Sequence, residues 1–433
     1  MTLKKWAAFL LLSAPCAPAW TQQYDPFDRL GTLQGNDNPF GRDRNVGVSE
    51  RPRPDYATVP IKAGSWEITP QVAAEASYDD NIYSTHSDRV DDLILRARPR
   101  LAIARPDPNF TVSLAGEYEA ARYLSNGSEN ADTYALKGDL RATVRRNTVF
   151  SLRVLQAREA EARFSPDSEE GIVRPNRFDI SEAYGEAVHT FNLLRLRGTI
   201  DYERRNYHDN HDQADAVIDQ DFRDRGTLTG SAIAEYALSP SVSLFAAGSA
   251  NWRDYATRIG PVPARDSKGY ELALGSSFEI GHLMRASLRL GYLDQNYRDP
   301  AFADVNGALV RGELAYFVTP LVTLTAKVDR SVVDSGLAGS AGYLRTAYSL
   351  KVDYELLRNL ILGAELGQEH RRYNGIDRDD DGFMGRFAAS YLISPRWALR
   401  AEFRHRGQDS SGIAAGRDFG GNQVTVGAVF KGL

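Results

Sequence analysis

From Ser65 to the C-terminus, apolar and polar side chains alternate with a period of two. The pattern is clear in segments 93–103, 110–119, 194–203, 348–355 and 399–404. In segment 93–103, leucine, alanine and isoleucine alternate with Arg96, Arg98 and Arg100. Successive side chains of a β-strand point to opposite faces, so each segment predicts a strand with one apolar and one strongly polar face.

Turn-forming residues separate these segments, and the connections are of two kinds. Tight turns are predicted at 106–109, 146–147, 191–192, 239–240, 281–282, 319–320, 358–359 and 394–395. Longer, charged connections are predicted at 79–92, 124–132, 158–177, 206–221, 257–267, 374–382 and 408–420. This alternation predicts about eighteen antiparallel strands of roughly ten residues each, the length of a membrane-spanning strand.

A β-propeller and an array of β-sandwiches are soluble alternatives, but the aromatic residues favour a membrane barrel. They fall near strand ends and predict two rings, which are the girdles expected at membrane–water interfaces. One ring holds Trp66, Phe110, Phe150, Tyr236, Phe278, Tyr316, Tyr354, Tyr391 and Trp397, and the other holds Tyr78, Tyr118, Tyr134, Tyr184, Tyr202, Trp252, Tyr270, Tyr292 and Phe383. A soluble barrel of about eighteen strands would also enclose more volume than side chains can fill. We therefore predict an all-β fold, a transmembrane antiparallel up-and-down β-barrel whose polar face surrounds water.

Composition excludes several other classes of protein. No apolar stretch beyond the N-terminus is long enough for a transmembrane helix. The 52 Lys and Arg against 57 Asp and Glu argue against nucleic acid as the main partner. The 42% hydrophobic content is too high for a mainly disordered chain, and the single cysteine excludes a disulfide scaffold.

The first 64 residues predict two segments that precede the barrel. Lys4 and Lys5, a short apolar run and Ala17-Pro18-Ala19 form the pattern of an export signal over residues 1–19. Residues 20–64 combine prolines, turn formers and charges, which predicts an extended periplasmic leader that acts as a solvated tether. The barrel itself is predicted over residues 65–433.

The last predicted strand, 423–433, carries a possible assembly signal. Its polar start, Gly427 and Phe430 resemble the C-terminal signal that the outer-membrane assembly machinery reads. The chain departs from that signal by continuing beyond Phe430 to Leu433.

Two stretches carry a family resemblance. Trp66, Ile68, Pro70 and Val72 lead into the stretch Tyr78-Asp79-Asp80-Asn81-Ile82-Tyr83, and an Arg/Tyr-rich strand end follows at 202–207. Together they resemble the putative β-barrel porin type 2 family over most of residues 65–433. The resemblance implies an outer-membrane barrel of a Gram-negative bacterium, in a family with some members linked to exopolysaccharide secretion. It carries over no catalytic residue.

The polar face predicts which side chains line the lumen. The candidates are Arg96, Arg98, Arg100, Glu117, Glu119, Arg141, Arg195, Arg197, Asp201, Glu203, Glu271, Glu279, Arg285, Arg289, Asp353 and Glu355. Neighbouring strands can pair arginine with carboxylate, so the charges could simply brace the wall. Alternatively, arginines along a hydrated conduit could transiently bind acidic groups such as the uronates or pyruvates of polysaccharides.

One aspartate-rich stretch is a weak candidate for a calcium site. Asp377, Asp379 and Asp381 precede Gly382 with the spacing of the first half of a calcium loop. Ala388 stands where that loop needs a bidentate acid, which favours a solvated loop without an ion.

The histidines give little support to a metal site or an enzyme. Residues 208–212 contain two histidines and two aspartates but lack helical metal-site spacing. His370 and His405 lie near predicted outer strand ends without a nucleophile motif. We predict no enzyme and no cofactor.

These observations predict an outer-membrane channel for a polar solute, with envelope or exopolysaccharide export as the first hypothesis. The alternatives are a general diffusion porin, a structural or adhesion barrel that acts through its loops, and an outer-membrane hydrolase. Expected partners are outer-membrane lipid and lipopolysaccharide, the assembly machinery and a periplasmic polysaccharide-export partner, with no nucleic acid.

Overall fold

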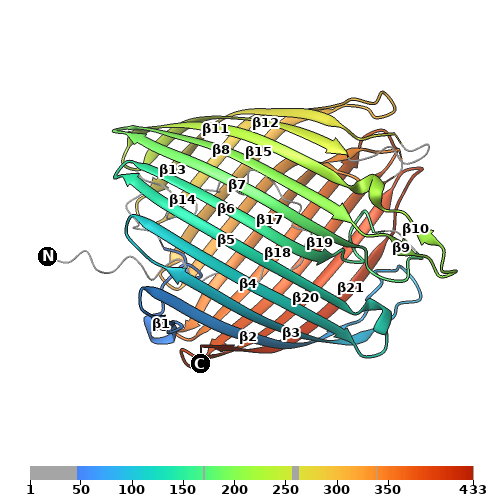
Figure 1. The fold of residues 1–433 in the computed structure, drawn as a ribbon, viewed down its shortest axis with the longest axis horizontal. Coiled ribbons are helices and arrows are strands. Elements are labelled where there is room, and N and C mark those ends of the chain that lie inside the picture. The colour runs from blue at the N-terminus through green and yellow to red at the C-terminus, as the bar shows by residue number, and fades with distance from the viewer. Residues whose placement is uncertain (1–45, 169–170, 256–262, 338, 433) are drawn as a thin grey trace.

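The chain folds into a closed antiparallel β-barrel of eighteen strands, with one short extra strand, β1, paired to its first strand (Figure 1). The fold is seen in a computed structural model that describes residues 46–168, 171–255, 263–337 and 339–432. The predicted export signal and the leader up to residue 45 lie outside the described residues. Among the described residues, no helix has the length and apolar character needed to cross a membrane.

The elements follow one another around the barrel in chain order. The barrel strands are β2 (Trp66–Asp79), β3 (Asp92–Arg105), β4 (Phe110–Tyr123), β5 (Ala131–Arg145), β6 (Thr148–Ala160), β7 (Arg177–Phe191), β8 (Leu194–Tyr207), β11 (Arg225–Ser239), β12 (Val242–Tyr255), β13 (Ser267–Ile280), β14 (Met284–Tyr297), β15 (Val305–Thr319), β16 (Val322–Asp334), β17 (Gly342–Leu357), β18 (Leu360–Tyr373), β19 (Asp379–Leu392), β20 (Trp397–Ser411) and β21 (Phe419–Lys431). Smaller elements are β1 (Ile61–Ala63), β9 (Asn210–His211), β10 (Val217–Ile218) and the 3-10 turns η1 (Pro54–Tyr56), η2 (Gly127–Glu129) and η3 (Asp221–Arg223).

The barrel closes where its first and last strands meet. Strand β2 pairs with β3 on one side and with β21 on the other, in a register that joins Ala73 to Val429. The hairpin of β1 and β2 sits beside this closing seam. Every barrel strand in the described part of the chain has two partners, so the barrel wall itself has no open edge.

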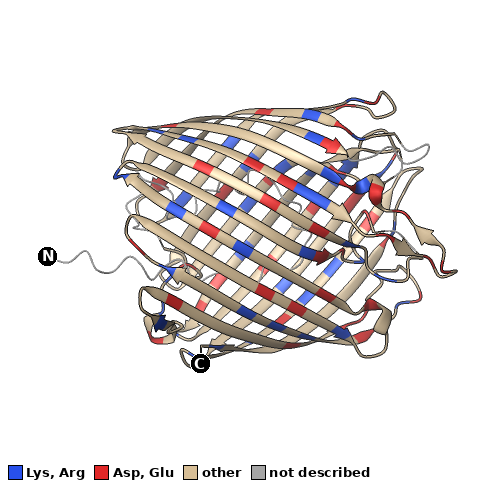
Figure 2. Cartoon of the chain, viewed as in Figure 1, with Lys and Arg blue, Asp and Glu red and all other residues tan. Residues whose placement is uncertain are grey.

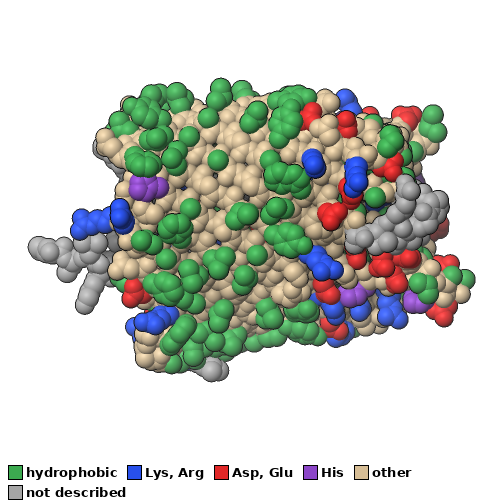
Figure 3. Space-filling view, turned by 45° about the horizontal axis from the view of Figure 1, so that its top comes forward, with side chains coloured by type: hydrophobic (Ala, Val, Ile, Leu, Met, Phe, Trp, Pro, Cys, Tyr) green, Lys and Arg blue, Asp and Glu red, His purple; other side chains and the backbone are tan. Residues whose placement is uncertain are grey.

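Apolar side chains face outward, as the alternation predicts. Leu95, Leu114 and Leu350 are 44, 53 and 43% exposed. The outer surface carries apolar side chains over much of its height, and charged side chains gather toward one end (Figure 3). A soluble barrel would bury these leucines, so the membrane-barrel prediction is confirmed and the propeller and sandwich alternatives are excluded.

All eight predicted tight turns connect neighbouring strands at one end of the barrel, here named the short-turn end. The opposite long-loop end has the seven predicted connections and two more, at 298–304 and 335–341. The sequence analysis missed both, and only 335–341 lacks the charged residues that marked the predicted connections. The strands have 13 to 16 residues, longer than the predicted ten, because inter-strand pairing continues past the apolar band.

One member of the predicted aromatic rings points the other way. Tyr184 is only 7% exposed, its hydroxyl donates to Glu186, and the Arg153 guanidinium lies 5.9 Å from its ring centre. The prediction of an outward-facing Tyr184 was wrong, because residue 184 falls on the same face of β7 as Glu182 and Glu186.

Candidate channel lumen

The predicted lumen residues lie at strand positions that alternate with the exposed apolar ones, and charges of both signs mark the strands (Figure 2). Arg96, Arg98, Arg100, Glu117 and Glu119 line a cavity of about 650 Å³, here named the chamber. Asp201, Glu203 and Glu271 line a smaller cavity of about 90 Å³. Arg195, Arg197, Arg289, Asp353 and Glu355 are buried, Glu279 and Arg285 are half-buried, and Arg141 is exposed.

Many of these charges are paired along or between strands. Arg98 binds Glu75 at 3.0 Å and also contacts Glu119. Arg205 binds Glu203 at 2.7 Å on the same face of β8. Such pairs neutralise the wall and fix its side chains, so the bracing role has direct geometric support.

The chamber nevertheless has a surplus of positive charge. Twelve of its lining residues are basic and nine are acidic. The whole chain has the opposite balance, with 52 basic and 57 acidic residues. The lining of the chamber is therefore enriched in basic side chains relative to the whole chain.

The connection between β6 and β7 folds inward across the long-loop end. The Arg406 guanidinium of β20 lies over the ring of Phe164, 4.5 Å from the centre of that ring. Asp167 accepts a 2.9 Å hydrogen bond from the amide of Gly336, in the connection between β16 and β17. These partners lie on different sides of the barrel, so residues 161–168, here named the inner loop, narrow the mouth.

A buried ion pair anchors the inner loop. Arg223 of η3 binds Glu161 at 2.8 Å, and both side chains are almost fully buried. Burial disfavours both charges, but each partner outweighs it: the pKa of Glu161 is lowered and that of Arg223 is raised. Both groups therefore stay ionised. Burial instead raises the pKa of Asp167, although Arg223 opposes the shift.

The short-turn end is obstructed by the described part of the leader. Val48 is fully buried and donates its amide to the Thr323 hydroxyl at 3.0 Å. Arg51 and Arg53 bind the same carboxylate, Glu355, at 3.0 and 3.1 Å. We name residues 47–53 the strap.

The strap reaches a wall far from the strand that follows it. Glu50 also binds Arg285 of β14 at 2.9 Å. Its partners lie on β14, β16 and β17, whereas the chain continues into β1 and β2 at the closing seam. The prediction of a solvated tether was wrong for this part of the leader, because Arg51 and Arg53 bind one buried carboxylate, Glu355, in the wall.

Sequence reasoning missed the aromatic residues that face the chamber. Phe178, Tyr207 and Tyr255 are buried among arginines, and the Arg223 guanidinium lies 4.1 Å from the Tyr207 ring centre. A signal was present for Tyr207, which has the same parity as the polar positions of β8, whereas in β7 polar residues occur at both parities and Phe178 was not marked. Stacked guanidinium and aromatic groups give the outer half of the chamber a mixed polar and apolar surface.

The structure does not bring the calcium candidates together. Asp379 and Asp381 lie within β19, where Asp381 binds His370 at 2.9 Å and Asp379 lies 3.9 Å from Arg372. Asp377 instead accepts a hydrogen bond from the amide of Ile413.

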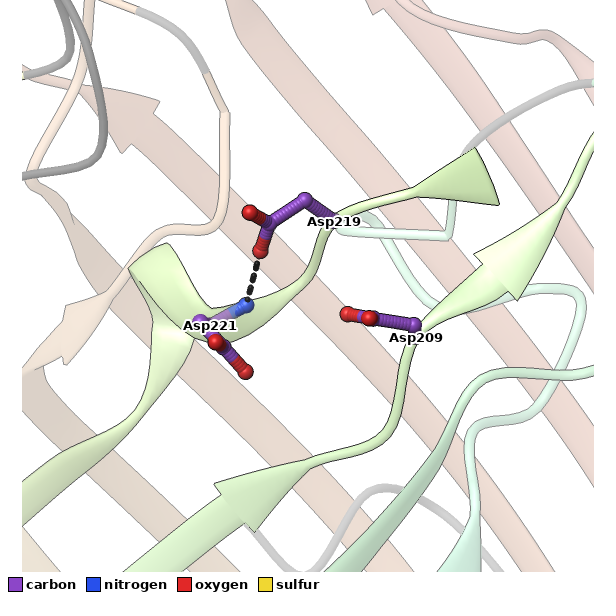
Figure 4. A group of neighbouring side chains, drawn as sticks. All are labelled: Asp209, Asp219 and Asp221. Atoms are coloured by element: carbon purple, nitrogen blue, oxygen red, sulfur yellow. Dashed lines mark hydrogen bonds between the residues drawn. The ribbon is translucent and has the colours of Figure 1, made fainter. Parts of the chain in front are cut away.

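Another acidic group forms in the connection between β8 and β11. The carboxylates of Asp209, Asp219 and Asp221 offer oxygens within 4.8 Å of one another (Figure 4). All three side chains are exposed, and Asp219 is occupied by a 2.9 Å hydrogen bond from the amide of Asp221. Burial, and then the neighbouring Asp219 and Asp209, raise the pKa of Asp221.

Three of the histidines, His208, His370 and His405, have structural partners. His208 binds Asp179 at 3.0 Å, and His405 contacts the Asn422 side chain at 2.9 Å. His370 is bound by Asp381 as described above. These contacts lie near the long-loop end, and none of them includes a serine, threonine or cysteine nucleophile.

A family model matches most of the chain. The model described as "Putative beta-barrel porin 2" matches residues 53–432. Searching the curated proteins gives no match.

Several solved outer-membrane structures are similar. The outer membrane protein opdK from Pseudomonas aeruginosa has 12% sequence identity and a TM-score of 0.45, and the match covers 84% of this chain and 99% of opdK. OccK2 (OpdF) from the same organism has 13% identity and a TM-score of 0.46, and the match covers 84% of this chain and 98% of OccK2. The siderophore receptor PirA from Acinetobacter baumannii has 7% identity and a TM-score of 0.47, and the match covers 84% of this chain and 80% of PirA.

Proposed function

Because the chain belongs to the family described as "Putative beta-barrel porin 2", we propose that this outer-membrane porin-like barrel passes a polar, carbohydrate-like solute and serves envelope polysaccharide export. The short-turn end then faces the periplasm and the long-loop end faces outward, as in other bacterial outer-membrane barrels.

The chamber is the observation that carries the proposal. It is lined by guanidinium groups, carboxylates, amides and aromatic rings rather than by a packed apolar core. Hydrated sugars offer hydroxyls to polar groups and ring faces to aromatics, so this mixture suits them. Many weak contacts, with no single tight site, are what passage requires.

Two features favour a gated export channel over a general diffusion porin. The inner loop obstructs one mouth through Glu161, Phe164 and Asp167, and the strap obstructs the other through Arg51 and Arg53. A general porin needs a pathway that stays open, whereas an exporter can hold its pathway narrow until its polymer arrives.

The export proposal is tested in cells that lack the protein. We expect less surface polysaccharide and accumulation of its precursor in the periplasm, measured by immunoblot of separated fractions. Restoring the wild-type gene should reverse both changes. Unchanged surface polysaccharide without precursor accumulation would overturn the export role.

Passage itself is tested with the purified barrel in planar lipid bilayers. We expect small, discrete conductance steps that increase when the strap is removed. A strap-deleted barrel that inserts but never conducts would contradict a channel of any kind.

A further inference from the structure

The chamber contains three basic side chains that its acids do not neutralise. Several of those acids already have basic partners: Asp79 binds Arg406 at 2.8 Å, Glu129 binds Arg163 at 2.6 Å, and Asp334 binds Arg225 at 3.2 Å. The cationic surplus must therefore reside elsewhere on the wall.

It resides in Arg100 of β3, Arg400 of β20 and Lys431 of β21, all of which line the chamber. Within the described part of the chain, none of these three side chains forms an ion pair or a hydrogen bond. All three are half-buried, so they are partly removed from water yet still reachable from it.

Strand register places two of these cations in one row. Lys431 is the pairing partner of Gln71, and Gln71 is in turn the partner of Arg100. Adjacent strands lie about 4.8 Å apart, so the backbones at Lys431 and Arg100 are separated by roughly 10 Å, with an amide side chain between them. Arg400 enters from β20, the next strand beyond β21.

Glu117 is the acid closest to this row in register, since it is the cross-strand partner of Arg100. It is exposed, and no ion pair joins it to Arg100 or to another described cation. The row therefore keeps its positive charge.

We infer that Arg100, Arg400 and Lys431, with Gln71 among them, form a binding subsite for the carboxylate of a sugar acid. This inference rests on the proposed function and names the chemical class of its solute. Guanidinium forks match the two oxygens of a carboxylate, and the lysine adds a flexible charge. The Gln71 amide can both donate to and accept from sugar hydroxyls.

The position of the subsite suits the first contact of a solute that arrives from the periplasm. Thr58, in the segment that connects the strap to β1, lines the same chamber. Lys431 is the last residue of β21, at the short-turn end. An acidic sugar that passes the strap meets this row before it reaches the aromatic outer half.

Calorimetric titration of the purified full-length barrel in detergent tests the subsite, with galacturonate and neutral galactose as probes. We expect galacturonate to bind measurably and galactose to bind at least about tenfold more weakly, because the charge-assisted hydrogen bonds are missing. The triple variant Arg100→Gln, Arg400→Gln, Lys431→Gln should lose galacturonate affinity by about tenfold or more. Arg298→Gln, which removes an 84% exposed arginine in the connection between β14 and β15, should bind like the wild type.

Three results would overturn the inference: unchanged affinity in the triple variant, equal binding of galactose, or equal binding of inorganic phosphate. Retained heat-modifiable migration in electrophoresis shows that the triple variant has closed its barrel. If that variant does not fold, the single variants Arg100→Gln and Arg400→Gln decide the matter in the same titration. This titration measures binding and neither conduction nor export. The proposed function can therefore fail while the subsite is confirmed, and the subsite can fail while the proposed function is confirmed.

Discussion

At the scale of single residues, the same strand supports opposite environments on its two faces. Leu350 of β17 is 43% exposed, while the next residue, Lys351, binds Asp353 at 2.9 Å on the inner face. The alternation of the sequence reveals which face each residue occupies. It cannot reveal which charges pair, because pairing depends on the register between strands and on side-chain reach.

Substitution of an outward-facing leucine tests the orientation of the wall. Leu350→Arg places a charge on the apolar face near the middle of β17, and we expect it to destabilise the barrel by about 2–4 kcal/mol. Lys351→Arg, one residue away on the inner face, should change the stability little. Unfolding by guanidinium in lipid vesicles measures both, and equal effects of the two substitutions would contradict the outward orientation of Leu350.

The carboxyl group of Asp167 should make the position of the inner loop depend on pH. Burial raises the pKa of its carboxyl in the folded state, while nearby Arg223 lowers it and Glu161 raises it. A carboxyl group whose pKa is raised when the loop lies inward is compatible with that position while it is protonated, at low pH. As the pH rises through the raised pKa the group ionises, and the inward position loses this stabilisation. We expect conductance through the barrel to rise with pH over this interval.

The substitution Asp167→Asn isolates that effect, since the amide oxygen can still accept from Gly336 but the side chain cannot ionise. The conductance of this variant should be nearly independent of pH over the interval. Asp88→Asn, at an exposed position in the connection between β2 and β3, should behave like the wild type. A pH response that persists in Asp167→Asn would assign it to another group.

At the scale of elements, strands were predictable and inserted segments were not. Period-two alternation and turn residues located the eighteen barrel strands, because both signals are local. The strap and the inner loop are held by residues far away in sequence, such as Glu355 and Gly336. A sequence rich in prolines and charges is compatible both with a solvated tether and with a segment that binds a buried carboxylate.

The strap should limit passage at the periplasmic mouth. Glu355→Gln removes the carboxylate shared by Arg51 and Arg53, so we expect the strap to detach and the single-channel conductance to rise, toward that of a variant lacking residues 47–53. Glu365→Gln serves as the control, because Glu365 pairs with Arg386 of β19 and does not contact the strap. Equal conductance of wild type and Glu355→Gln would show that the strap does not restrict flow.

At the scale of the whole molecule, closure gives every barrel strand two hydrogen-bonded neighbours. The first and last strands join through nine paired positions, from Gln71 with Lys431 to Asp79 with Gln423. The number of strands followed from counting segments, but closure followed only from the argument that a large polar interior must surround water.

Removing β21 should open the barrel. A variant that ends before Phe419 leaves β2 and β20 with unpaired backbone groups, which cannot be satisfied in lipid. Refolded from urea into detergent, it should lose heat-modifiable migration, whereas a variant that ends at Lys431 should retain it. A folded, heat-modifiable product lacking β21 would contradict closure through the seam of β2 and β21.

The continuity of the strap with the first barrel strand has a consequence for biogenesis. Only residues 54–65 separate the strap from β2, and β2 is the strand that completes the cylinder with β21. The strap therefore travels with the seam and is inside when the last strand docks. We therefore expect each newly inserted barrel to carry the strap in its periplasmic mouth from the outset, so that overproduction of the protein does not increase the uptake of small antibiotics into the cell.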